Sequence, residues 1–374
     1  MEDRIYEYWA ATIQDGYIGN LIDIVERAGG AKSLYYMTSE DMLNKLGLTK
    51  RMASHISDLR EGIDIEKNYV KMINDGISYV NYKDSDFPSR LLEISSCPYG
   101  LFVKGSLPDA NRKSVAIIGA RECSEYGRLM AEYLGDKLAK SGINVISGMA
   151  WGIDGIAQMA TLRAGGLSYG VLGCGPDVVY PRKNIEVYER LLENGNGVIS
   201  EYAPGMEAKA QRFPPRNRII AGLSDAVIVV EARAKSGTLI TVEMAVDQGK
   251  TIMVVPGRLT DPLSVGCLKL IKEGAVPITC FEDVLEEIGE IEADKNKGKS
   301  EMGINSKKEK ELNLTSQEKK VFNLISLDGL TPDFIADKLT MPIEEVLVIL
   351  TNLEMKSLIK EEGSFKFIRN ITLT

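Results

Sequence analysis

Histidine is nearly absent from this 374-residue sequence, which contains only His55. That residue lies far from the glycine-rich middle of the chain, so His-dependent catalytic triads and multi-His metal centres are not expected there. The five cysteines are scattered without CxxC spacing, which indicates reduced thiols rather than disulfides or a zinc site. The sequence therefore predicts no metal cofactor.

Long apolar runs and a positive net charge are also missing. No stretch approaches the roughly 20 apolar residues that cross a bilayer, and the opening MEDRIYEYWA lacks the basic-then-apolar order of a signal peptide. We therefore expect a cytoplasmic protein without a membrane partner. The net charge is −8, so a nucleic acid would require a local patch of cations.

The chain is long enough for one large core with smaller flanking units. Residues 1–80 carry apolar positions at helical spacing and form the first predicted domain. Within it, residues 39–56 predict a helix, a turn at Gly47 and a second helix, with Ser39 as N-cap. Such a pair resembles SAM-like or helix-hairpin-helix modules, and a small packing domain is the alternative.

Residues 81–290 begin with a proline-punctuated lead-in and then repeat a strand–helix rhythm. Their strands are apolar throughout, which is typical of a parallel sheet covered on both faces by helices. The fold class is therefore α/β, with a Rossmann-like, mostly parallel sheet. Residues 291–312 have dense mixed charge and predict a disordered linker. Residues 313–374 predict three helices and a β-hairpin, which together describe a winged-helix domain.

Small residues follow the predicted strands, at the sheet edge where open α/β folds bind ligands. Gly119 permits a tight turn after the first strand, and Arg121 projects a cation there. The next glycines do not complete GxGxxG, so a dinucleotide cofactor is not expected. The segments Ser147-Gly148 and Ser236-Gly237-Thr238 each precede or open a helix, and their amides should face an anion. An ordinary N-cap is the alternative for each.

The strongest local signal is the segment 209–218, KAQRFPPRNR, which holds four cations and no acid. Its two prolines are expected to hold an extended loop that displays Phe213. A ring among cations suits a nucleic-acid single strand, because bases stack on rings while cations follow phosphates. A solvated loop with Phe213 tucked into the core is the alternative. The candidate binding residues here are Lys209, Arg212, Phe213, Arg216, Asn217 and Arg218, joined by Arg182 and Lys183.

Several of these motifs, in this order, resemble the DprA/Smf family of recombination mediators, known as DNA-processing protein A. The resemblance covers residues 80–285 and rests on DFPSRLLEI, IIGAR, SGMAWGID, GVLGCGPDVVYP, FPPRNRIIAGLS, SGTLIT and VVPG. It implies a non-catalytic homodimer that binds and protects incoming single-stranded DNA and loads the RecA recombinase on it during natural transformation. It also implies DNA contacts by Arg121, Arg182, Lys183, Phe213, Arg216 and Arg218. Gln158 departs from the family, in which histidine is common at this position.

Two other functions stay open. Similar sheets occur in nucleotide phosphoribohydrolases, in which Glu243 or Asp154 would act as the acid–base carboxylate. A transcription regulator led by the winged helix is the other possibility. From Asn313 onward, however, seven Lys and Arg stand against nine Asp and Glu, and the expected recognition helix begins with Glu344 and Glu345. Protein contact or packing is therefore favoured there over duplex reading.

Overall fold

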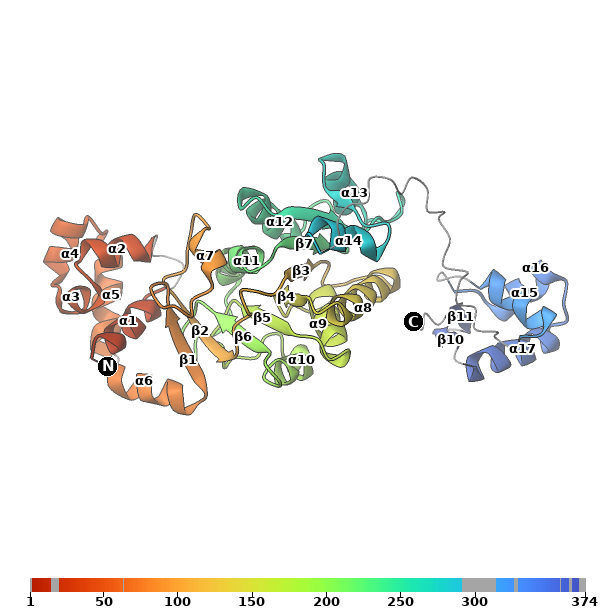
Figure 1. Ribbon diagram of the computed structural model, residues 1–374, viewed down its shortest axis with the longest axis horizontal. Coiled ribbons are helices and arrows are strands. Elements are labelled where there is room, and N and C mark those ends of the chain that lie inside the picture. The colour runs from red at the N-terminus through yellow and green to blue at the C-terminus, as the bar shows by residue number, and fades with distance from the viewer. Residues whose placement is uncertain are drawn as a thin grey trace. The chain divides into compact units, whose positions relative to one another are not determined.

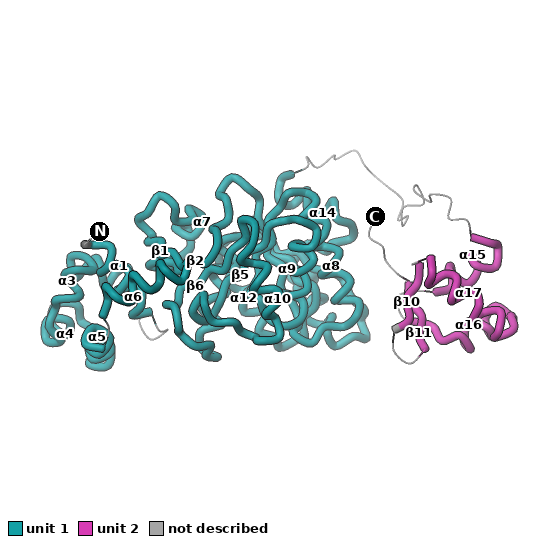
Figure 2. The backbone as a smooth tube through the Cα atoms, turned by 90° about the horizontal axis from the view of Figure 1, so that it is seen from below, with its two compact units in different colours: residues 1–292 teal, residues 293–374 magenta. Residues whose placement is uncertain are grey.

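The computed structural model describes residues 2–14, 20–62, 64–290, 314–325, 329–356, 358–362 and 365–369. The chain divides into two compact units, residues 1–292 and 293–374 (Figure 2). The predicted linker over 291–312 lies outside the described residues. None of the helices in the described ranges is long and apolar enough to span a membrane.

Six helices open the first unit: α1 (Glu2–Thr12), α2 (Leu21–Arg27), α3 (Ala31–Tyr36), α4 (Ser39–Leu46), α5 (Lys50–Gly62) and α6 (Ile65–Asn74). The predicted helix pair corresponds to α4 and α5, and Gly47 ends α4 with a φ of 62°. The prediction of Ser39 as N-cap is wrong. Thr38 takes that position, because its backbone is still extended and its Oγ1 accepts a hydrogen bond from the amide of Asp41.

A nine-stranded sheet follows, in the order β1-β2-β6-β5-β4-β3-β7-β8-β9 (Figure 1). β2 runs antiparallel to β1 and β6, whereas the pairs from β6 to β9 are parallel. The mostly parallel, Rossmann-like prediction is therefore confirmed. The strands are β1 (Ile77–Asn81), β2 (Gly100–Gly105), β3 (Ser114–Ile118), β4 (Asn144–Ser147), β5 (Ser168–Leu172), β6 (Gly197–Ser200), β7 (Ala226–Val229), β8 (Thr251–Val254) and β9 (Val276–Pro277).

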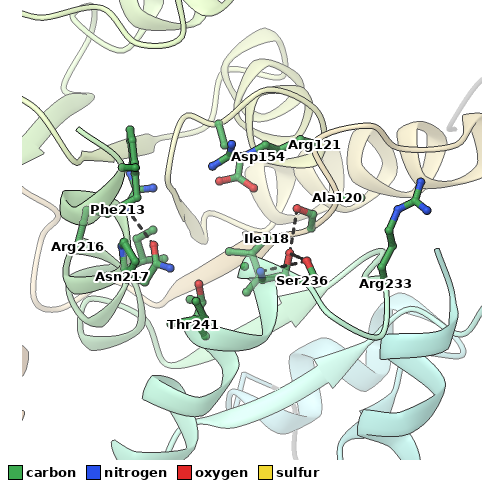
Figure 3. Close-up of a pocket in the computed structure, with 18 of the residues that line it drawn as sticks. Ile118, Ala120, Arg121, Asp154, Phe213, Arg216, Asn217, Arg233, Ser236 and Thr241 are labelled. Carbon is green, nitrogen blue, oxygen red and sulfur yellow. Dashed lines mark hydrogen bonds between the residues drawn. The ribbon is translucent and has the colours of Figure 1, made fainter. Parts of the chain in front are cut away.

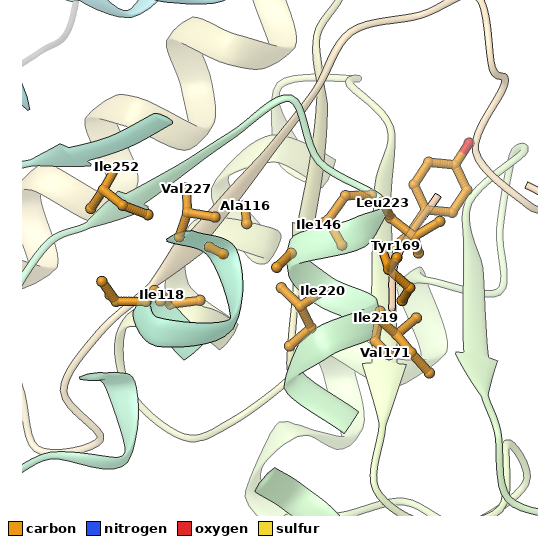
Figure 4. Packing of buried hydrophobic residues seen from close by; sticks show 14 of the residues in the cluster. Ala116, Ile118, Ile146, Tyr169, Val171, Ile219, Ile220, Leu223, Val227 and Ile252 are labelled. Atoms are coloured by element: carbon orange, nitrogen blue, oxygen red, sulfur yellow. The ribbon is translucent and has the colours of Figure 1, made fainter. Parts of the chain in front are cut away.

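Two helical layers sandwich this sheet because successive strand residues point to opposite faces. In β3, Ala116 and Ile118 pack with one helical layer, whereas Val115 and Ile117 pack with the other. The first layer contains α11, whose Ile219 and Ile220 cover the strands in Figure 4. The helices of this region are α7 (Ser89–Leu92), α8 (Glu125–Lys140), α9 (Ile153–Arg163), α10 (Ile185–Arg190), α11 (Phe213–Gly222), α12 (Gly237–Asp247), α13 (Val265–Lys272) and α14 (Phe281–Glu287).

The helical segment at the start of the chain shares a core with one end of the sheet. Trp9 from α1 belongs to the same apolar cluster as Tyr79 of β1 and Phe102 of β2. Arg4 adds a two-pronged ion pair, with Nη1 and Nη2 at 2.8 and 2.6 Å from the carboxylate oxygens of Asp84. β1 runs across the predicted boundary at residue 80, so the helices continue directly into the sheet.

The second unit is a winged helix, as predicted. It contains α15 (Ser316–Leu324), α16 (Pro332–Leu339), α17 (Ile343–Met355) and the antiparallel strands β10 (Ile359–Glu362) and β11 (Lys366–Arg369). The exposed side of α17 carries Glu344, Leu347 and Val348. It is therefore apolar and acidic where duplex recognition would need cations.

Candidate functional site

A cleft of about 700 Å³ opens at the carboxyl edge of the sheet. Its lining comes from the segments that follow β3, β4, β5, β6 and β7, and from α11. The chain leaves β3 toward β4 and leaves β7 toward β8, in opposite directions along the sheet. This is the topological switch point at which open α/β sheets place their ligands. We call the cleft the switch-point pocket.

The basic segment forms a wall of this pocket, but the prediction of an extended loop is wrong. Residues 213–222 are the helix α11, preceded by a short 3-10 turn over Ala210–Arg212. Pro214 and Pro215 lie in the first helical turn, where the missing amides are not needed for intrahelical hydrogen bonds. The helix directs every third or fourth side chain toward the sheet, so the cations of this segment diverge.

Arg216 points inward from α11 and is buried. Its guanidinium donates a hydrogen bond of 2.9 Å to the carbonyl of Gly148 and a second to the carbonyl of Val171, at the ends of β4 and β5. Burial lowers the pKa of Arg216 to about 10, which the negative charge of Asp154 opposes. Arg216 therefore lines the pocket from below and links the ends of β4 and β5, and the DNA contact that the family resemblance implies for it stays a prediction.

Arg212 and Arg218 are also held by the protein. Arg212 is buried, donates to the carbonyl of Glu207 at 2.6 Å and lies over the ring of Tyr202. Arg218 forms a 2.6 Å ion pair with the buried Glu201. Donors of both guanidinium groups are therefore used inside the protein, and the DNA contacts expected of Arg212 and Arg218 stay predictions. Lys209 is the one cation of segment 209–218 that is exposed.

Phe213 faces the pocket and is partly buried. Its ring lies 5.3 Å from that of Tyr180, centroid to centroid, with 32° between the planes, and Tyr180 is 44% exposed. Gly173 makes room for this arrangement, since a Cβ there would lie 2.8 Å from the Phe213 ring. Figure 3 shows Phe213, Arg216 and Asn217 on one side of the pocket and Arg233 on the other, with Ser236 between them. The exposed ring of Tyr180 is thus available beside the cleft, whereas the Phe213 ring also packs against Arg216, whose Cζ lies 5.6 Å from its centroid.

The start of α12 provides an anion-receptive group on the pocket wall. Ser236 is the N-cap, and its Oγ accepts from the amide of Thr238. Thr238 Oγ1 in turn donates to the carbonyl of Gly119, which fixes the helix start against the β3 loop. The exposed amide of Gly237 has no hydrogen-bond partner in the described part of the chain. It can therefore bind an anion at the positive end of the helix.

The start of α9 does not provide a second such group, so that prediction is corrected. The buried Asp154 fills the position with its own carboxylate, which accepts a 3.1 Å hydrogen bond from the amide of Gly148 and another from Ala150. A Cβ at Gly148 would come within 3.0 Å of both Asp154 and Arg216. Ser147 is buried and donates to the carbonyl of Ile117. Both residues build the floor of the site rather than its surface.

Exposed cations instead come from the loops around the rim. Arg121 follows β3, and Arg233 and Lys235 follow β7; all three line the pocket and none has an acidic partner among the described residues. One exposed acid, Glu122, lines it as well. Arg233 and Lys235 were not among the residues predicted from the sequence. Their positions could have indicated them, because they lie three and one residues before Ser236, the N-cap of α12.

The remaining candidates lie in different surroundings. Glu243 is exposed and lines a separate groove beside α12 and α13, away from the switch-point pocket. Asp154 borders the pocket, and burial raises the pKa of its carboxyl against the opposing charge of Arg216.

Arg182 and Lys183 are exposed in a short 3-10 turn before α10. Gln158 is buried and donates to Ser168, so its difference from the family pattern falls in the core.

Comparisons with known proteins identify the relatives of this chain. The family model for DNA recombination-mediator protein A matches residues 78–289, and that for the DprA winged helix domain matches residues 305–363. The chain is 37% identical over 249 residues to Protein Smf of Escherichia coli K12, an alignment that spans 66% of each chain. It is 43% identical over 204 residues to DNA processing protein DprA of Streptococcus pneumoniae, covering 54% of this chain and 72% of that protein.

Two solved structures are also similar to this chain. The X-ray structure of DNA processing protein A from Streptococcus pneumoniae has a TM-score of 0.65 at 34% identity, and the match covers 76% of this chain and 97% of that one. The structure of DNA processing protein A from Helicobacter pylori, reported for its single-stranded DNA binding mode, has a TM-score of 0.50 at 28% identity. That match covers 57% of this chain and 96% of the other.

Proposed function

The chain belongs to the DNA recombination-mediator protein A family, and on that basis we propose that it binds single-stranded DNA in the switch-point pocket. One observation carries the proposal. Unpaired rim cations, the Tyr180–Phe213 ring pair and the exposed amide of Gly237 converge on a single sheet edge of a chain whose net charge is −8. Such a combination can hold phosphates and a base at the same time.

A single strand suits this pocket better than a duplex. Bases in a duplex are stacked on one another, so they cannot enter a cleft to meet the rings of Tyr180 and Phe213. The exposed Glu344, Leu347 and Val348 of α17 also do not provide the cations that duplex contacts need. A dinucleotide is also disfavoured, since the turn after Gly119 lacks the GxGxxG pattern.

The same proposal extends to the handling of the bound strand. The chain would act as a homodimer, without catalysis, that protects incoming single-stranded DNA in the cytoplasm and loads the RecA recombinase on it during natural transformation. The family resemblance supports this part of the proposal. Its test is a strand-exchange assay in which single-stranded DNA is first covered by a single-strand binding protein. Adding the chain should restore RecA activity, and a rate that stays at the covered-DNA level would contradict it.

The binding proposal is tested by titration with labelled single-stranded and duplex DNA at about 50 mM and about 200 mM salt. We expect tighter binding to the single strand and a steep loss of affinity with salt. Replacing Arg121 or Lys235 with alanine should weaken binding and reduce the salt slope by about 1 each. Equal affinity for duplex, or wild-type binding by both variants, would refute the proposal.

Lys272 provides the matched control. It is an exposed lysine in the last turn of α13, outside the lining of the switch-point pocket. Lys272→Ala removes the same charge from the same unit, so it should leave both affinity and salt slope within experimental error. A loss equal to that of Lys235→Ala would mean that binding depends on overall charge rather than on the pocket.

A further inference from the structure

Trp151 is exposed beside the switch-point pocket. It lies in the turn between β4 and α9 and is 47% exposed, whereas the other tryptophan of the chain, Trp9, is fully buried. A large ring left in water forgoes the apolar burial that stabilises most tryptophans. Its position therefore needs an explanation other than packing.

A second cleft, of about 330 Å³, lies against this ring. Its lining includes Trp151, Lys183 and Met159, and we call it the Trp151 cleft. Arg121 and Glu122 line both this cleft and the switch-point pocket, so the two cavities adjoin at the loop after β3.

Cations lie next to the ring. The Nζ atom of Lys183 is 5.1 Å from the centroid of the Trp151 ring. Neither Lys183 nor Arg121 has an acidic partner within the described ranges. The acids of the cleft include Glu186, which lies 3.9 Å from Arg163 and 3.8 Å from Arg190. Positive charge near Trp151 is thus available to a phosphate.

We propose that the Trp151 cleft is a second nucleotide subsite, in which a base stacks on Trp151 while an adjacent phosphate contacts Arg121 or Lys183. The inference rests on the proposed function and deepens it, because it extends the bound strand from one cleft to the next across Arg121. Stacking of a base would displace the Lys183 ammonium from the Trp151 ring to a phosphate. The ammonium interacts more strongly with the negative charge of a phosphate than with the face of a ring.

The mixed acidic and basic residues of the Trp151 cleft favour a nucleic-acid strand over a free nucleotide as its ligand. Glu122, Glu132 and Glu186 accompany its cations, so an isolated phosphate would gain little there. A strand already held in the switch-point pocket brings its next base to Trp151 at high effective concentration. The subsite should therefore contribute only to DNA long enough to reach from one cleft to the other.

The test combines fluorescence with an oligothymidine length series of about 4 to about 16 nucleotides. Because Trp9 is buried, quenching of tryptophan emission by DNA should report Trp151 alone. Trp151→Leu should abolish the quenching and weaken binding of the longest oligomer about tenfold, with little effect on the shortest. Trp151→Phe should retain most of the affinity. Tyr36→Leu, at another exposed ring of the same unit, is the control and should bind like the wild type.

The outcomes separate the two proposals. Wild-type affinity of Trp151→Leu for every length, together with unquenched wild-type emission, would overturn the second subsite and leave the switch-point proposal standing. Absence of single-strand binding by the wild type would overturn both. If circular dichroism shows that Trp151→Leu is unfolded, the wild-type quenching and the affinity of Trp151→Phe decide the question.

Discussion

Replacing Arg216 with alanine should damage the fold of the sheet edge, whereas replacing Arg121 should damage only binding. Arg216 is buried and donates to the carbonyls of Gly148 and Val171. Its loss leaves those acceptors without donors and leaves the buried carboxylate of Asp154 without a facing cation. The predicted consequence is a large fall in the free energy of unfolding.

The magnitude follows from the burial of both charges. Removing one partner of a buried, hydrogen-bonded charge arrangement costs about 3–5 kcal/mol. For a unit of this size, that corresponds to a fall in Tm of roughly 10 °C. Arg121 is exposed and has no acidic partner among the described residues, so Arg121→Ala should change the free energy of unfolding by less than about 0.5 kcal/mol.

Urea unfolding followed by far-ultraviolet circular dichroism measures both variants on one scale, and thermal unfolding checks the order. Arg216→Lys keeps the charge but replaces the planar fork by a single ammonium, so its stability should lie between those of the wild type and Arg216→Ala. If the free energy of unfolding of Arg216→Ala equals the wild-type value, Arg216 does not stabilise the sheet edge through its hydrogen bonds. The residue would then have to be accessible to DNA.

Gly173→Ala should push the Phe213 ring out of place, which should lower the free energy of unfolding by about 1–3 kcal/mol and also lower the affinity for single-stranded DNA. An unchanged melting curve and an unchanged DNA titration would contradict the close contact between residue 173 and the Phe213 ring. Burial alone would raise the pKa of Asp84, but its bonds from Arg4 and the Asn81 amide outweigh this and lower it. The ion pair therefore contributes its full stabilisation at pH values above the unfolded pKa of Asp84, near 4. This stabilisation is lost as the pH falls through the lower pKa that Asp84 has in the folded protein. Asp84→Asn should therefore reduce the fall in the free energy of unfolding at acid pH. Removing residues 293–374 should leave single-strand affinity unchanged, and a loss in the titration would assign DNA contacts to the winged helix.

The sequence was a reliable guide to the fold where local pattern and burial agree. Strands such as Ser114–Ile118 are buried along their whole length, and an unbroken apolar run has no other stable location than the middle of a covered sheet. The helix Glu125–Lys140 begins after Ser124, a residue type that favours this position, because the Ser124 side chain accepts from the amide of Gly127. A strand as short as β9 is not predictable in this way, because its two residues, Val276–Pro277, carry almost no pattern of their own.

The direction of each side chain at the site was decided by tertiary structure alone. The amino-acid pattern predicted that glycines, hydroxyls and cations gather at the carboxyl edge of a Rossmann-like sheet. It did not determine that Arg216 turns inward, because its acceptor Val171 lies 45 positions away in the chain. Nor did it determine that Asp154 occupies the α9 helix start. Local composition fixes which charges are present, whereas long-range packing determines which are satisfied inside the protein and which remain on the rim for a ligand.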